Sequence, residues 1–147
     1  MTDATHARAQ WMSVLARASR ADLEAYWDDL AAQAQFTWLK KPEFGAVLVR
    51  GRVNGREAEF NVGELALTRC SVQLADGPVG VAYVAGCDER HATMAAVLDA
   101  LLQAGDARSI LARAAVAALT ARLAQRRKHA AEKTETSRVD FTMAMRD

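Results

Sequence analysis

The chain has 147 residues, of which 51% are apolar and 32 are alanine, and its 19 basic and 18 acidic side chains leave a net charge of +1. This length predicts one domain. The balanced charge excludes a highly charged disordered chain and gives no electrostatic argument for binding nucleic acid or a membrane surface. No apolar run reaches the roughly 18 residues that a spanning helix needs, and the first residues lack the apolar core of a signal peptide, so we expect a cytoplasmic protein.

The first part of the chain predicts two helices. Residues 5–18 carry large apolar side chains, Trp11 among them, at helical spacing. Ser19 is a favourable N-cap for a second helix, and Trp27 lies on the apolar stripe of that helix. We therefore expect a helical hairpin that presents an aromatic face, with Trp11 and Trp27 as candidates for contact with a partner.

The next part changes to strand periodicity. Residues 36–40 predict a strand that ends near Pro42, and Asn54-Gly55 is a favoured two-residue hairpin turn. A hairpin of residues 46–53 and 56–62 around that turn places Val49 opposite Phe60. It also places Arg50 opposite Glu59 and Arg52 opposite Glu57, which are stabilising pairs.

A second hairpin is predicted for residues 65–75 and 79–85, with Asp76-Gly77 as its turn. The resulting register places Cys70 opposite Tyr83 and Val72 opposite Val81, and it gives one wholly apolar face. The reverse face then pairs Gln73, Ser71 and Arg69 with Gly80, Ala82 and Val84. The two hairpins and the first strand predict an antiparallel sheet of four to five strands with one dry face.

Two long helices and a tail complete the predicted fold. Asp88 can cap a helix that runs to about residue 104, ends at Gly105 and covers the dry face with its apolar stripe (Met94, Val97, Leu98, Leu101 and Leu102). The second helix spans residues 107–133, with an apolar side that begins at Ile110 and fades after Leu123. We expect an α+β fold with a single domain, residues 1–136, and an extended C-terminal tail, residues 137–147.

The tail alternates like a strand. Its large apolar side chains are Val139, Phe141, Met143 and Met145. Such a face is not left in water at a free terminus, so it either docks on this domain or adds a strand to another chain. Exchange of this tail between copies would give a homodimer of the isolated chain.

No residue pattern predicts catalysis or a metal site. Two cysteines cannot close a zinc site, the three histidines lack a ligand spacing, and Cys70 and Cys87 are expected to be reduced. An anion site shared with a partner is one reading of Arg69, His91 and Arg138, because a forked guanidinium and a histidine in the first turn of a helix both suit phosphate-like groups. The other reading is an ordinary ion pair and a histidine packed at a sheet–helix junction. The basic cluster of residues 122–128 is read as complementing the helix dipole rather than binding nucleic acid.

Several short motifs resemble one family in order and spacing. They are Arg8-Ala-Gln-Trp-Met-Ser-Val-Leu-Ala, Leu67-Thr-Arg, Asp76-Gly followed by Gly86, His91-Ala-Thr-Met-Ala-Ala-Val-Leu-Asp-Ala-Leu, and Ser137-Arg-Val-Asp-Phe. Together they resemble PhnG, the G subunits of the bacterial carbon–phosphorus lyase system, over nearly the whole chain.

This resemblance implies a role in phosphonate catabolism within a complex of PhnG, PhnH, PhnI and PhnJ. With PhnH, PhnI and PhnL, the family supports transfer of an alkylphosphonate onto the ribose of MgATP with displacement of adenine, giving alpha-D-ribose 1-methylphosphonate 5-triphosphate when the phosphonate is methylphosphonate. The resemblance implies no catalytic residue in this chain, no cofactor bound by it, and MgATP as a substrate of the complex. We therefore expect a non-catalytic subunit, and the alternative is a stand-alone α+β protein that binds a small molecule or nucleic acid.

Overall fold

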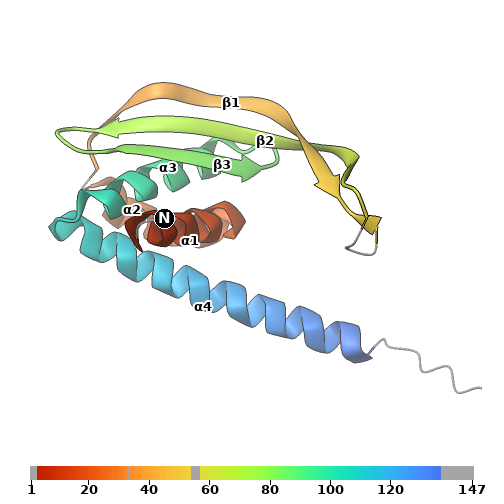
Figure 1. Cartoon of the computed structure of the whole chain (residues 1–147). Coiled ribbons are helices and arrows are strands. Elements are labelled where there is room, and N and C mark those ends of the chain that lie inside the picture. Colours follow the sequence, from red (N-terminus) through yellow and green to blue (C-terminus); the bar gives the residue numbers. More distant parts are fainter. Residues whose placement is uncertain (1–2, 33, 54–56, 137–147) are drawn as a thin grey trace, which may run out of the picture.

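The computed structural model describes residues 3–32, 34–53 and 57–136. The elements follow one another as two helices, three strands and two helices (Figure 1): α1 (Asp3–Arg17), α2 (Arg20–Ala31), β1 (Phe36–Gly51), β2 (Phe60–Leu74), β3 (Val79–Ala85), α3 (Glu89–Ala104) and α4 (Ala107–Thr136). The strands form an antiparallel sheet in the order β1-β2-β3. The predicted α+β class and both helix pairs are confirmed. The predicted tail and the turn at residues 54–55 lie outside the described residues.

The prediction of four to five strands is wrong, because neighbouring predicted strands are continuous. β1 runs from Phe36 to Gly51 through Pro42, and the register shifts on either side of Lys40 accommodate the interruption. Proline is tolerated there because β1 is an edge strand, and a bulge absorbs the irregular pairing. In the same way, β2 joins the two segments that were expected to be separate strands.

The first hairpin also differs in register. Val49 lies opposite Gly63, and Phe60 lies opposite Gly51, with a shift between Val49 and Arg50. The last pair of β1 and β2 is therefore Gly51 with Phe60, whereas a two-residue loop at residues 54–55 would continue the pairing to Val53. The predicted pair of Arg50 and Glu59 is present at 3.4 Å, whereas Arg52 binds Glu59 at 3.0 Å instead of Glu57.

The second hairpin is shifted by one residue from its prediction, and the predicted faces of β3 are therefore reversed. Cys70 lies opposite Ala82, not Tyr83, and Val72 lies opposite Gly80. Leu74 N–H donates to the carbonyl of Pro78, and Asp76 takes a left-handed conformation with φ 51°. The buried face of β3 consists of Gly80, Ala82 and Val84, while Tyr83 is exposed.

Helix α3 provides the physical reason for this register. A Cβ atom on Gly80 would collide with the carbonyl oxygen of Ala96 and would lie 2.7 Å from the backbone nitrogen of Ala100. The helix approaches β3 so closely that only a small residue fits beneath it. Placing Val79, Val81 and Tyr83 on this face would force the helix away from the sheet.

The core lies between the sheet and the helices. Asp88 caps α3 by accepting a hydrogen bond from the backbone N–H of His91 at 2.9 Å, and Gly105 ends the helix with φ 70°. As predicted, the apolar stripe of α3 is fully buried: Met94, Val97, Leu98, Leu101 and Leu102. Ser19 caps α2, also as predicted. In α4, Ile110 is 68% exposed, contrary to its predicted place on the buried side, and Ala112, Ala115 and Leu119 face the core.

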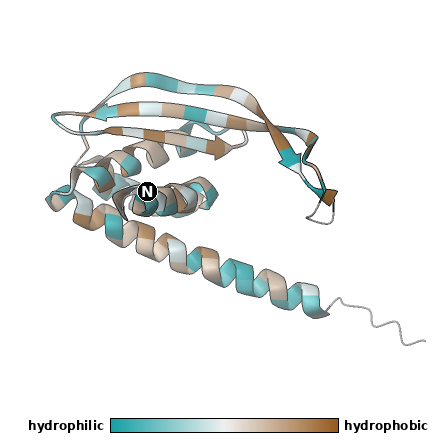
Figure 2. Ribbon diagram, in the orientation of Figure 1, coloured by the Kyte–Doolittle hydropathy of each residue, from teal (hydrophilic) through white to brown (hydrophobic). Residues whose placement is uncertain are grey.

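The β1–β2 hairpin extends beyond the rest of the sheet. The last pair of β2 and β3 is Leu67 with Ala85, so the remainder of β2 has only β1 beside it. We call residues 44–53 and 57–65, at and beyond the end of β3, the β-arm. In Figure 1 the β-arm and the far end of α4 project on the same side of the molecule, and Figure 2 shows that hydrophobic positions continue along the strands into this part.

Candidate functional site

The structure does not bring together the residues predicted to bind an anion. His91 is buried, and its Nε2 donates to the carbonyl oxygen of Leu15 at 2.8 Å. Arg69 is exposed and lies between the buried residues Thr68 and Cys70, so it faces away from the helices. Because α3 packs on the opposite face of the sheet, Arg69 and His91 lie on different sides. Arg138 falls outside the described residues.

The guanidinium of Arg69 is engaged on the outer face of the sheet. It donates to the carboxylate of Glu43, which lies opposite it in the ladder and also accepts from Lys40 at 2.9 Å. The hydrogen bonds from Lys40 and then from Arg69 lower the pKa of Glu43. In the isolated chain, Arg69 is therefore a member of an ordinary ion pair, which was the second of the two interpretations of its sequence position.

A buried carboxylate that sequence reasoning missed holds three elements together. Asp99, on α3, accepts from the Nε and Nη2 atoms of Arg8 at 3.2 and 2.8 Å, from the indole of Trp11 at 2.8 Å and from the backbone N–H of Val81 at 3.0 Å. Gln103 adds another donor at 3.1 Å. The signal in the sequence was an acidic residue inside a helix whose neighbours are almost all apolar, because a buried charge needs partners.

The two tryptophans are in part structural. Trp11 is tied to Asp99, and both Trp11 and Trp27 are partly buried and pack against the core. Trp27 also lines a depression of about 500 Å³ together with Trp38 and Met94. Contact of their exposed parts with a partner stays a prediction.

Another buried carboxylate connects α2 with the basic cluster on α4. Asp22 accepts from the Ser19 hydroxyl at 2.6 Å, from Arg122 at 2.9 Å and from Arg126 at 2.5 Å. The hydrogen bond from Ser19, followed by those from the two arginines, lowers the pKa of Asp22 to about 2. Two arginines of the basic cluster therefore connect α4 to α2, a role that the interpretation in terms of the helix dipole did not include.

The cysteines are free thiols, as predicted. Cys70 is buried, which raises its pKa to about 11, and Cys87 is exposed. In the part of the chain that the structure describes, no three His, Cys, Asp or Glu side chains gather as metal ligands require. Among these residues, no helix is long and apolar enough to cross a membrane.

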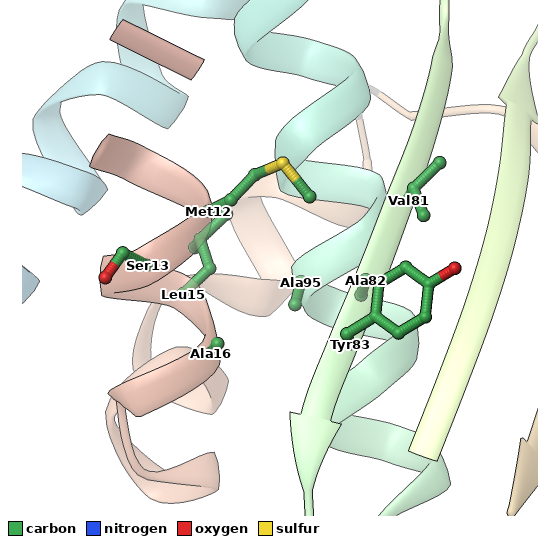
Figure 3. A pocket seen from close by; sticks show the side chains of 8 residues that line it. All are labelled: Met12, Ser13, Leu15, Ala16, Val81, Ala82, Tyr83 and Ala95. Atoms are coloured by element: carbon green, nitrogen blue, oxygen red, sulfur yellow. The ribbon is translucent and has the colours of Figure 1, made fainter. Parts of the chain in front are cut away.

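The cavities bring few reactive groups together. A pocket of about 230 Å³ lies between α1 and β3 (Figure 3), where α1 contributes Met12 and Leu15 and β3 contributes Val81 and Tyr83. Its remaining polar side chain, Ser13, accepts from Arg17 at 2.7 Å. A wider depression of about 710 Å³ is lined by Arg8, Trp11, Gln103 and Arg113, but the first three of these already bind Asp99.

Comparison with known proteins decides the family. The model of the family described as "Phosphonate metabolism protein PhnG" matches residues 6–146. The chain belongs to the PhnG family. The resemblance read from the short motifs is thereby confirmed, and PhnG proteins function in phosphonate metabolism.

A curated relative supports the same assignment. The Rhizobium meliloti (strain 1021) protein named alpha-D-ribose 1-methylphosphonate 5-triphosphate synthase subunit PhnG is 37% identical over 143 residues. The match covers 95% of this chain and 88% of that relative, so this PhnG-family chain corresponds to nearly the whole subunit.

Proposed function

We propose that this chain is the PhnG subunit of an alpha-D-ribose 1-methylphosphonate 5-triphosphate synthase and that it contributes binding surface rather than reactive groups. Membership of the PhnG family supports the first half of the proposal. The second half rests on one observation: among the described residues, no buried side-chain nitrogen or oxygen atom lacks a hydrogen-bond partner. Asp22, His91 and Asp99 each connect different elements, which makes them unsuitable as free acids, bases or nucleophiles.

The substrates in this proposal belong to the assembly. An alkylphosphonate replaces adenine on the ribose of MgATP, and groups on other subunits carry out that displacement. This chain binds no cofactor of its own and assembles with PhnH, PhnI, PhnJ and PhnL. An anion site that Arg69 and Arg138 complete with a partner is a further proposal, and for Arg69 it requires release of Glu43 on assembly.

Reconstitution tests the proposed division of labour. Adenine release from MgATP and methylphosphonate is expected from the complete set of subunits, none is expected from this chain alone, and omission of this chain is expected to abolish it. Adenine release by the isolated chain would contradict a non-catalytic role. Unchanged turnover of complexes that carry Arg69→Ala or Arg138→Ala would remove the anion site from the proposal.

The C-terminal tail is the proposed contact with PhnI. Burial of Val139, Phe141, Met143 and Met145 would contribute about 1.5–3 kcal/mol for each side chain before ordering costs. Deletion of residues 138–147 is therefore expected to abolish co-purification with PhnI while the circular dichroism of the remaining chain stays that of the folded protein.

Serine substitutions on the two faces of the tail distinguish a role of its apolar side chains from a role of its length alone. Replacing the four apolar tail residues with serine should reproduce the effect of the deletion, whereas Thr142→Ser and Ala144→Ser together should not. Normal assembly of the truncated chain would show that the tail is not the contact.

A further inference from the structure

The β-arm carries an unusual amount of exposed apolar surface. Eight of its large apolar side chains are between 40% and 60% exposed: Phe44, Val47, Leu48, Val49, Val53, Phe60, Val62 and Leu65. A concentration of exposed apolar side chains in one part of the surface marks an interaction site. A two-stranded ribbon also has little stability of its own in water, so this part of the fold gains from being covered.

Both faces of the β-arm carry large apolar side chains. From Phe44 to Val49 the pairing of β1 with β2 is uninterrupted, so successive side chains point to opposite faces. Phe44 and Leu48 lie on the face that continues the buried side of the sheet, where Phe44 pairs with buried Thr68. Val47 and Val49 lie on the other face, with Leu65 opposite Val47. A flat docking surface on a partner would cover only one of these sets.

We propose that the β-arm inserts into an apolar slot of another subunit of the synthase, which covers both of its faces. This inference rests on the proposed function. The exposed fractions of these eight residues correspond to about 700 Å² in total, which lies within the range of roughly 600–1,000 Å² that one partner contributes to an interface of standard size.

The charges of the β-arm are partly compensated within the hairpin. Arg50 and Arg52 both pair with Glu59, at 3.4 and 3.0 Å. Glu57 and Glu64 are exposed, and Glu64 lies opposite Leu48 in the ladder. A slot that covers this face therefore has to place a cation or water beside Glu64, while shape and apolar area carry the rest of the recognition.

A second copy of this chain fits the β-arm less well. Among the described residues, the large apolar side chains exposed elsewhere are Trp38, Leu39, Tyr83 and Ile110, which are spread over β1, β3 and α4. They offer no second apolar surface that matches the β-arm. Two copies could pack their arms together, but that arrangement covers one face of each arm and leaves the other in water.

Paired lysine substitutions test the slot. Val47→Lys and Leu48→Lys place a charge on opposite faces, and Ile110→Lys on α4 is the control at another exposed apolar residue. Full-length variants are co-expressed with the other synthase subunits, and retention of those subunits on the tagged chain is measured. Because all three side chains are exposed, the melting temperature of each isolated variant should stay within a few degrees of the wild-type value.

Each arm variant is expected to lower retention of the partner subunits at least tenfold, with no change for Ile110→Lys. Amide exchange of residues 44–51 and 60–65 is expected to slow at least tenfold when the wild-type chain enters the complex. Wild-type retention by either arm variant would overturn the slot while leaving the proposed function intact. Failure of the wild-type chain to retain any synthase subunit would overturn both. Loss of self-association without loss of partner retention would identify a second copy as the occupant and overturn the proposal.

Discussion

Gly80 shows how one residue sets the arrangement of two layers. Its missing side chain lets the backbone of α3 lie directly on β3, where a Cβ atom would meet Ala96 and Ala100. No local pattern in the sequence identifies this role, since glycine next to a proline turn also reads as a simple loop signal. The requirement comes from a helix that begins nine residues later in the chain.

Substitution of Gly80 by alanine should therefore be strongly destabilising. We expect Gly80→Ala to lower the free energy of unfolding by about 3 kcal/mol or more, because the obstructing atoms include rigid backbone. Gly45→Ala is the control, since nothing lies within 4 Å of a Cβ there, and its change should stay within about 1 kcal/mol. Urea unfolding followed by circular dichroism gives both values. Equal stability of the two variants would show that α3 can move away from β3 at little cost.

At the scale of elements, caps and periodicity predicted the helices, while strand register could not be predicted. Ser19, Asp88 and Gly105 act through residues next to them, so their roles follow from local chemistry. Register in the second hairpin depends on which face of β3 best accepts α3, and both faces of the predicted hairpin contained apolar residues. The local pattern was therefore satisfied by two registers, and tertiary packing selected one of them.

The features of the candidate site were likewise only partly predictable from the sequence. Motif order was sufficient to identify the PhnG family, because it needs no spatial information. Whether Arg69 and His91 can share a site depends on which side of the sheet each one occupies. The alternation of buried Thr68 and Cys70 with Arg69 could have placed Arg69 on the outer face, but no comparable pattern places His91. Asp99 could have been suspected from its apolar neighbours, but its partners on α1 and β3 could not have been named.

The contact between α2 and α4 should make stability depend on acidity. Asp22 has a pKa of about 2 in the folded chain and an ordinary value of 3.8. A lowered pKa means that the stabilisation is complete above pH 5 and is lost as the pH falls through 3.8 toward 2. The full effect is about 2 kcal/mol.

Asp22→Asn tests this contribution. At pH 6 the variant should be about 2 kcal/mol less stable than the wild-type chain, and the difference should shrink toward zero near pH 2. Asp29→Asn changes an exposed carboxylate on the same helix and should show no comparable pH dependence of its difference from the wild-type chain. A constant difference for Asp22→Asn from pH 6 to pH 2 would contradict the linkage.

On the scale of the whole molecule, stability should be graded from the core outward. The centre of α3 and the part of β2 beneath it are buried, whereas the β-arm and the last third of α4 are exposed. Segments with few buried apolar contacts open locally at lower free energy.

Hydrogen exchange of the isolated chain should reveal this gradient. We expect the slowest amides in residues 94–102 and 68–74, and exchange at least a hundredfold faster in residues 46–51 and 125–135. The helical far end of α4 provides an internal control for secondary structure without burial. Uniform protection across these segments would mean that the exposed parts are stabilised in some way other than through the core.

The exposed apolar surface of the β-arm has a consequence for production of the protein. Exposed strands that carry apolar side chains can pair edge to edge and aggregate. We therefore expect a larger soluble fraction when this chain is co-expressed with the other synthase subunits than when it is expressed alone.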